Sequence, residues 1–336
     1  MRRPRMKAEG AGYYHCMSRI IERRAILGEA EKETLLRLMR ELAGFGGLEV
    51  LTYCFMSNHF HILVHVPERR DVTDEEFLRR VAFIRRGGEL KALGRELRAR
   101  RQRGQAQAAE ALKARFTYRM YDLSEFFKAL KQRFSQAYNA RVERCGPLWE
   151  QRFKSLLVER AESALLTVAA YIELNAVRGG CVGDPKDYRY SGYGEALGGG
   201  REAREGLRRV LEAARGRRFA WGQAKCAYRQ RLYVQGQQRG LSPEGRPIRP
   251  GFTAEQVRAV LEAGGRLPMH EVLRCRVRYF SDGLALGGRE FVEGVFARYR
   301  GHFGPRRHSG ARPMRCGEWG ALCTLRDLRL APVSRV

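Results

Sequence analysis

The chain has 336 residues, of which 64 are Lys or Arg and 37 are Asp or Glu, so its formal net charge is +27. A hydrophobic fraction of 44% is enough to form a core, which excludes a disordered basic tail. Such a charge directs a protein toward polyanions, most often nucleic acid. An ordinary basic protein and one that binds an anionic membrane surface are the weaker alternatives.

The sequence shows no membrane-targeting pattern and no paired-cysteine motif. No apolar run approaches the roughly 20 residues of a membrane span, and no apolar signal core follows the basic N-terminus. We therefore expect a cytoplasmic protein without a membrane partner. The eight cysteines are scattered and form no C-x-x-C pair, which argues against a zinc ribbon and a disulfide scaffold.

The first elements alternate between strand and helix patterns. Strands are predicted over residues 13–21, 48–56 and 59–66, and the polar pair Ser57-Asn58 forms the turn between the last two. Apolar residues at helical spacing predict a helix over residues 31–45, which the following glycines end.

The next part begins with a long charged segment. Residues 69–121 are rich in Ala and Arg and are predicted to form a helical insertion, or arm. An amphipathic helix over 123–143, a strand over 153–158 and a helix over 162–177 follow. The order β-α-β-β-α-β with one more helix predicts an α+β fold, a ferredoxin-like antiparallel sheet with helices on one face.

A change in composition divides the rest of the chain. We expect a first domain over residues 1–195, a linker with short helices over 196–251 and a helical C-terminal region over 252–336. In that region helices are predicted over 254–261, 269–280 and 288–300, with residues 281–287 as a turn. Both a DNA-binding helix-turn-helix and a plain helical packing or dimerisation domain fit this pattern.

The most informative feature is the motif His59-Phe60-His61 in the third strand. Residues two apart in a strand point to the same face, so the two imidazoles project together, as a metal site requires. For such a motif alone, structural histidines would be the better interpretation. The candidate third ligand is Asn175, which lies four residues after Tyr171 on the final helix and so shares its face. A metal beside a tyrosine in a basic protein indicates phosphodiester cleavage.

Six segments in order give the chain a family resemblance. The chain resembles the single-tyrosine HUH (His-hydrophobic-His) transposases, which are IS200-like, and most of all the REP-associated tyrosine transposases. The segments are 14–15 with 18–19, 56–64, 130–134 with 138–139, 146–155, 171–180 and 187–193. Two departures are Ala176, where the family usually has proline, and the length of the 69–121 arm.

The resemblance implies a mechanism and a set of ligands. It assigns Tyr171 as the nucleophile, with Mg²⁺ or Mn²⁺ held by His59, His61 and Asn175. Mixed nitrogen and oxygen ligands suit Mn²⁺ somewhat better. The products would be a 5′-phosphotyrosine link and a free 3′-hydroxyl, with the phosphodiester energy conserved for rejoining. The base that activates the tyrosine is not identified.

The active-site type predicts single-stranded DNA as the substrate, and the resemblance implies that this DNA contains an imperfect hairpin. Arg152, Lys154 and Arg178 are candidate phosphate ligands, although surface arginines are usually only solvated. Trp149 and Phe153 are as well explained by core packing as by base stacking.

The sequence is also compatible with other functions and assemblies. Glu173 is expected to be solvated and His65 to be structural or phosphate-facing. The alternatives to a bacterial, nucleoid-associated transposase are a catalytically silent DNA-binding or regulatory protein on the same scaffold and, more weakly, an RNA-binding ferredoxin-like protein. Relatives occur both as monomers and as homodimers, so the oligomeric state stays undecided.

Overall fold

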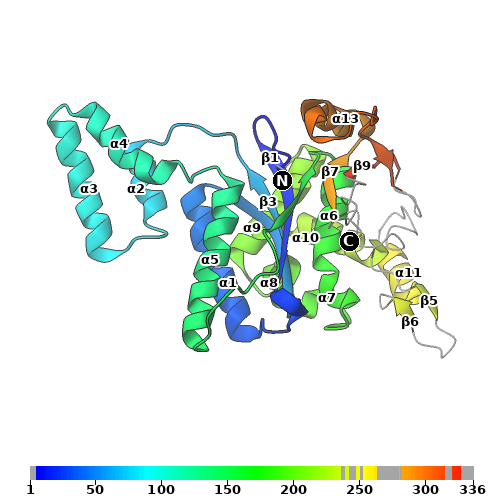
Figure 1. Cartoon of the computed structure of the whole chain (residues 1–336). Helices are drawn as coiled ribbons and strands as arrows, with labels where there is room; N and C mark the ends of the chain where they lie inside the picture. The colour runs from blue at the N-terminus through cyan, green and yellow to red at the C-terminus, as the bar shows by residue number, and fades with distance from the viewer. Residues whose placement is uncertain are drawn as a thin grey trace, which may run out of the picture.

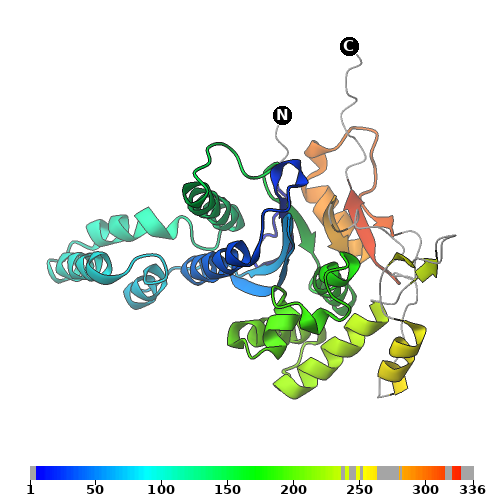
Figure 2. The ribbon, with the colours of Figure 1, turned by 90° about the horizontal axis from the view of Figure 1, so that it is seen from below.

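The computed structural model describes residues 5–235, 239–241, 247–249, 253–262, 280, 282–314 and 320–326. Its centre is a mixed sheet with helices on both faces (Figures 1 and 2). The first elements are β1 (Gly12–Arg19), η1 (Ile21–Arg23), α1 (Glu29–Gly46), β2 (Glu49–Phe55) and β3 (His59–Val66). After the arm come α5 (Leu123–Arg141), β4 (Lys154–Val158) and α6 (Glu162–Glu173).

The first four strands have the order β2-β3-β1-β4. β1 is antiparallel to both β3 and β4, and β2 is antiparallel to β3. This is the strand order of a ferredoxin-like sheet, so the predicted α+β class is confirmed. The three strands and the helix predicted between residues 13 and 66 are found within a few residues of their expected ends.

The two faces of the sheet are covered by different helices. Phe60 of β3 stacks on Phe127 of α5, so the even positions of β3 face the layer of α1 and α5. His61 contacts Tyr171 of α6, so the odd positions face the opposite layer. The expectation that helices lie on one face of the sheet is therefore wrong. Every α6 residue from Ala164 to Glu173 is buried, and a helix apolar on all sides must be covered on all sides.

The predicted insertion is helical and has a core of its own. It contains α2 (Asp74–Val81), α3 (Gly87–Gln102) and α4 (Ala106–Thr117), which form an arm projecting from the sheet at the left of Figure 1. Phe77, Val81, Leu97 and Leu112 are buried together in a cluster separate from the main core.

The segment expected to be a linker belongs to the main core. It follows α7 (Asn175–Arg178), η2 (Pro185–Asp187) and α8 (Gly192–Leu197), and it forms α9 (Arg201–Arg215) and α10 (Trp221–Gln235). α9 packs against α6 and β2 and buries Leu207, Val210 and Leu211. The linker prediction is therefore wrong for residues 201–235: the glycines before α9 end one helix and begin another.

The C-terminal region extends the sheet. It contains β7 (Gly283–Gly287), α13 (Arg289–Arg298), η3 (Arg300–His302), β8 (Arg312–Pro313) and β9 (Cys323–Arg326), preceded by the hairpin of β5 (Arg239–Leu241) and β6 (Pro247–Arg249) and by α11 (Ala254–Glu262). β7 runs parallel to β4, and β9 and β8 follow it at the sheet edge.

Two predictions for this region have different outcomes. The predicted turn over residues 281–287 is wrong, because β7 pairs with Leu157 and Val158 and so becomes a strand. The region is thus not wholly helical, although helices occur near 254–261 and 288–300. Residues 269–279 of the remaining predicted helix lie outside the described residues. In the part of the chain that is described, none of the helices has both the length and the apolarity needed to cross a membrane.

Candidate active site on the α6 face of the sheet

The candidate site is built on the odd positions of β1 and β3. In the antiparallel register Arg19 lies opposite His59, and Met17 lies opposite His61. Directly opposed residues share a face, so these side chains point together toward α6. The sequence prediction that His59 and His61 share a face is consistent with this register, and their rings lie 5.1 Å apart between centroids.

His61 is buried and makes its side-chain hydrogen bond to a third histidine. Its Nδ1 lies 2.8 Å from Nε2 of His15, and the two rings are stacked with centroids 5.0 Å apart. Burial lowers the pKa of His61 well below its usual value, and the neighbouring His15 and His59 act in the same direction. His61 is therefore neutral at neutral pH, which is the form that binds metals.

His59 has an equivalent hydrogen bond of its own. Its Nδ1 lies 2.6 Å from Oδ1 of Asn58, whose Nδ2 donates to the carbonyl of Arg23. Burial lowers the pKa of His59 to about 4, with smaller contributions from Arg19 and Arg178. The Nε2 atoms of His59 and His61 form no hydrogen bond with any described residue, so both remain available to a ligand.

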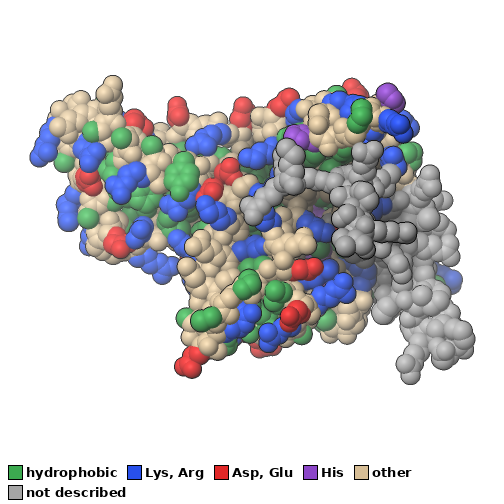
Figure 3. Space-filling model, in the orientation of Figure 1, with side chains coloured by type: hydrophobic (Ala, Val, Ile, Leu, Met, Phe, Trp, Pro, Cys, Tyr) green, Lys and Arg blue, Asp and Glu red, His purple; other side chains and the backbone are tan. Residues whose placement is uncertain are grey.

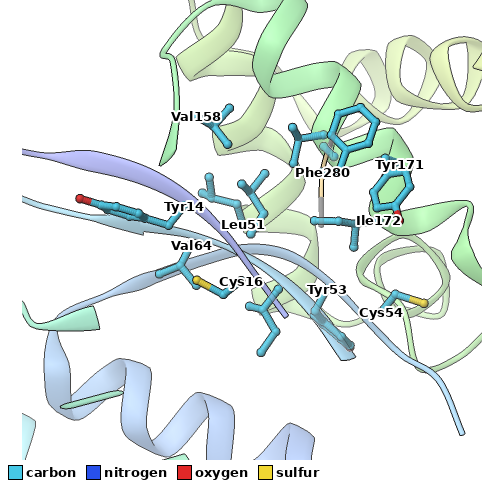
Figure 4. Close-up of a cluster of buried hydrophobic side chains, with 14 of the residues drawn as sticks. Tyr14, Cys16, Leu51, Tyr53, Cys54, Val64, Val158, Tyr171, Ile172 and Phe280 are labelled. Atoms are coloured by element: carbon cyan, nitrogen blue, oxygen red, sulfur yellow. The ribbon is translucent and has the colours of Figure 1, made fainter. Parts of the chain in front are cut away.

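Tyr171 reaches this pair of histidines from α6. Its ring lies 5.7 Å from that of His61 and 5.9 Å from that of His15, in both cases edge to face. Only 5% of the residue is exposed, because Phe280 stacks on the ring at 4.6 Å (Figure 4). The predicted nucleophile and the histidine pair are thus brought together, beneath a cover from the C-terminal region.

Two guanidinium groups influence the charge of the tyrosine oxygen. Arg178 lies 4.2 Å from the ring centroid and donates to the carbonyl of Tyr171. Burial raises the pKa of the Tyr171 hydroxyl above its usual value, whereas Arg178 and Arg19 oppose that increase. Both arginines therefore favour a negatively charged tyrosine oxygen at this position.

Asn175 begins α7, one turn after Tyr171. Its Nδ2 donates to the carbonyls of Tyr171 and Ile172, at 3.2 and 3.1 Å, so its Oδ1 is the atom left for another partner. α6 and α7 are nearly continuous, since Leu174 N bonds to Ala170 O and Arg178 N to Leu174 O. Within the described residues no three His, Cys, Asp or Glu side chains form a metal cluster. The candidate ligand set is two histidines and an amide.

The other predicted phosphate ligands lie farther out. Arg152 and Lys154 are exposed. Lys154 is opposite Met17 and therefore shares the face of His61, but its Nζ is paired with Asp282 at 3.0 Å. Phe153 is a core residue that packs on Phe127, whereas Trp149 is partly buried against the core and its indole donates to Ser135 Oγ.

Two expectations concerned the single residues Glu173 and His65. The prediction that Glu173 is solvated is wrong: it is 0% exposed and accepts hydrogen bonds from Thr52 and from the backbone N–H of Tyr193. Burial raises its pKa to about 7. His65 bonds to Glu49 and stacks on Tyr13, which agrees with a structural role.

Sequence reasoning missed the roles of His15 and Arg19. Both lie in the segments that carry the family resemblance, but no role was assigned to them. The available signal was their spacing, because His15, Met17 and Arg19 alternate along one strand in the same way as His59 and His61. Only the register between β1 and β3 shows that the two series face each other.

A protein-family model matches the first part of the chain. Residues 10–75 match the family model described as "Transposase IS200 like". This match runs from β1 to the start of α2 and includes the two histidines of the motif, but it ends before Tyr171. The comparison with curated proteins gives no match.

One similar solved structure is described as "Structure of the REP associates tyrosine transposase bound to a REP hairpin". The identity is 15% and the TM-score 0.39, over 60% of this chain and 87% of that chain. A likeness of this size carries no argument about function.

Residues 10–75, which contain β1 to β3, are therefore similar to the IS200-like transposases. Over these residues the comparison agrees with the IS200-like resemblance drawn from the sequence.

Proposed function

We propose that the chain is a metal-dependent DNA strand transferase that nicks and rejoins single-stranded DNA at hairpin, REP-like sequences. The observation that carries the proposal is the position of Tyr171, whose ring lies 5.7 Å from that of His61 on the face that also holds His59 and Arg19. A binding protein has no need of this combination.

The residues fit a divalent metal. Nε2 of His59, Nε2 of His61 and Oδ1 of Asn175 would hold Mg²⁺ or Mn²⁺, and each of these atoms lacks a hydrogen bond to a described residue. Bound there, the ion would act as a Lewis acid on the scissile phosphate. The mixed nitrogen and oxygen set favours Mn²⁺ over Mg²⁺.

Tyr171 supplies the nucleophile. Its hydroxyl gives up a proton and Oη forms a bond to phosphorus, while the bond between phosphorus and the 3′ oxygen breaks. The 3′ oxygen takes up one proton and leaves as a 3′-hydroxyl, so the proton lost by the tyrosine and the proton gained by the leaving group balance. The product is a 5′-phosphotyrosine diester, which conserves the phosphodiester for rejoining. Arg178 and Arg19 lower the cost of ionising the hydroxyl, against the effect of burial.

The same two arginines would hold the phosphate. The Arg19 side chain forms no hydrogen bond or ion pair with a described residue, and it lies opposite His59 in the sheet. Lys154 shares this face, farther from His61. Arg152 is exposed nearby on the segment before β4. Phosphate contacts of this kind position a strand without reading its sequence.

The substrate follows from the chemistry and the charge. A tyrosine attack needs a phosphate in an unstacked strand, which indicates single-stranded DNA. The family resemblance adds the hairpin. Lys and Arg side chains are spread over the face shown in Figure 3, from the arm to the region of α13. With a net charge of +27, this surface supports attraction to a DNA backbone.

A catalytically silent DNA-binding protein is the second candidate. The observation that favours it is the burial of Tyr171 beneath Phe280, because a nucleophile covered on one side must be uncovered before it can attack.

A gel assay separates the two functions. A labelled single-stranded hairpin DNA from the gene's own flanks is incubated with Mg²⁺ or Mn²⁺ and wild type, Tyr171→Phe or Tyr138→Phe. Tyr138 is a partly exposed tyrosine of α5, on the opposite side of the sheet, and serves as the matched control. We expect a covalent protein–DNA band with wild type and Tyr138→Phe only. Binding without a covalent band in wild type, under either metal, would favour the silent protein.

A further inference from the structure

Three cationic side chains lie close together around the segment that precedes β4. Arg152 is an exposed residue of this segment. On one side of it, Nζ of Lys131 from α5 donates a hydrogen bond to the carbonyl of Gln151. On the other side, the guanidinium of Arg5 lies 3.6 Å from the ring centroid of Phe153. Arg5 and Lys131 therefore contact the two neighbours of Arg152 in the chain, and the three cations form one group, which we call the cation cluster.

No carboxylate of the described residues forms an ion pair with the cation cluster. The carboxylate of Asp122 acts on Arg5, but it already accepts from two N–H groups at the start of α5 and pairs with Lys7 at 3.5 Å. Burial lowers the pKa of Lys131 to about 8, and the charges of Arg5 and Arg152 contribute to this decrease. Like charges held together in the free protein favour an anionic ligand, because such a ligand removes their repulsion.

Two aromatic rings hold the cation cluster in place. Phe153 packs on Phe127 of α5, and Arg5 lies over its ring. The ring centroid of Trp149 lies 5.3 Å from Nζ of Lys131, and its indole donates to the carbonyl of Lys131 at 3.2 Å. Aromatic rings attract cations through their faces without accepting all of their N–H groups. The remaining N–H groups can bind the oxygen atoms of a phosphate, to which a guanidinium presents a fork and an ammonium a point charge.

We propose that the cation cluster is a second phosphate site, which holds the backbone of a DNA strand on the α5 side of the sheet. The inference rests on the proposed function for its ligand, DNA, and adds a contact on the side of the sheet away from Tyr171. The segment that carries Arg152 is fixed to the end of β1, since the N–H of Glu150 donates to the carbonyl of Arg19 at 2.9 Å. The Arg19 side chain lies on the face of His59. A strand that crosses this end of the sheet would thus contact the cation cluster on one side and the candidate active site on the other.

Binding of a labelled oligothymidylate tests the cation cluster without knowledge of the target sequence, because phosphate contacts do not read bases. The probe is titrated with the full-length chain and followed by fluorescence anisotropy at several salt concentrations, with chelator present so that cleavage does not interfere. The cluster variant and the control variant each lose three positive charges. The cluster variant combines Arg5→Gln, Lys131→Met and Arg152→Gln. The control variant combines substitutions of three exposed arginines that each pair with a glutamate, namely Arg37→Gln, Arg70→Gln and Arg85→Gln.

We expect the cluster variant to lose part of the salt dependence of binding. The slope of log affinity against log salt concentration should fall by about 0.7 if the three cations share one phosphate, and by about 2 if each holds its own. The control variant should keep the wild-type slope. An unchanged slope in the cluster variant would overturn the inference, and so would an equal decrease in both variants.

Substitutions of Arg152 alone separate a loss of charge from a loss of folding. The side chain is exposed, so neither Arg152→Gln nor Arg152→Lys should disturb the core. We expect Arg152→Lys, which keeps the charge, to bind oligothymidylate more tightly than Arg152→Gln. Equal affinity of these two variants would overturn the inference, since a phosphate site needs the charge at this position.

Inorganic phosphate distinguishes a site for the DNA backbone from a site for the free anion. At matched ionic strength it should displace oligothymidylate from wild type no better than chloride does. Stronger displacement by phosphate in wild type, absent in the cluster variant, would overturn the assignment to DNA.

The covalent protein–DNA band separates this inference from the proposed function. A covalent band in wild type, together with wild-type binding in the cluster variant, would reject the phosphate site and keep strand transfer. No covalent band in wild type, together with a reduced slope in the cluster variant, would keep the phosphate site and reject strand transfer. If wild type binds no oligothymidylate, the inference and the proposed function are both overturned.

Discussion

The close packing of α9 on β2 gives a test of whether residues 201–215 are core rather than linker. Gly206 lies inside α9, and a Cβ added there would be 2.5 Å from the carbonyl oxygen of Leu51 and 2.8 Å from that of Val50. Both atoms are backbone, so neither can rotate away. Gly294 lies inside α13, and a Cβ added there meets no atom within 4 Å.

The two glycines therefore predict opposite results for the same substitution. Replacing glycine by alanine inside an exposed helix stabilises it by about 0.5–1 kcal/mol, which is the expectation for Gly294→Ala. Gly206→Ala gains the same helix stability, but the added methyl group must push α9 away from β2. Such overpacking typically costs about 1–3 kcal/mol. We expect a net loss of about 1–2 kcal/mol for Gly206→Ala.

Urea unfolding of the full-length chain measures both effects under one condition. If the slope of the unfolding free energy against urea concentration is unchanged, the urea midpoint should fall for Gly206→Ala and rise for Gly294→Ala. A stabilisation of similar size in both variants would refute the argument, because it would mean that α9 is as free of the sheet as a linker helix.

Three further predictions concern charge and metal. The pKa of Lys131 is lowered to about 8 by burial and by Arg5 and Arg152. Between about pH 8 and the unfolded value near 10.5, the unfolded state binds more protons, so wild-type stability should rise with pH relative to Lys131→Met. Urea midpoints of wild type and Lys131→Met that change with pH in parallel across that range would contradict this prediction. Arg19→Gln should weaken single-stranded DNA binding and reduce the slope of log affinity against log salt concentration by about 0.7. Arg37→Gln, on the other face of the sheet, should cause no such change. A chelator should abolish the covalent band but not hairpin binding, and Mn²⁺ should restore the band; a band that persists with chelator would exclude metal dependence.

The strands and helices of the first 66 residues could be predicted because each has a local pattern. Apolar alternation and helical spacing are properties of neighbouring residues, and both were sufficient for α1, β2 and β3. The strand β7 has no such pattern: its five residues, Gly283–Gly287, include two glycines. Its conformation comes from pairing with Leu157 and Val158, more than 120 residues away in the chain. Pairing partners of this kind are not visible in a local window.

Glu173 shows the same limit for a single side chain. On a helix with one buried face its position would be solvated, which is why it was expected there. α6 is instead enclosed between the sheet and α9, and the carboxyl group is hydrogen-bonded by Thr52 and by the N–H of Tyr193. The error therefore came from the expected number of layers, not from the helix itself.

The candidate site depends on the register between β1 and β3 more than on any one residue. Successive residues of a strand alternate between faces, so a slip of one position would turn His59 and His61 toward α1 and α5 and away from Tyr171. Buried residues on both strands oppose such a slip. Phe60 between the two histidines is fully buried against Phe127, and on β1 the buried Cys16 lies between His15 and Met17. The apolar residues on one face thus fix the register, and the register brings His15, Arg19 and both candidate ligands to the other face beside Tyr171.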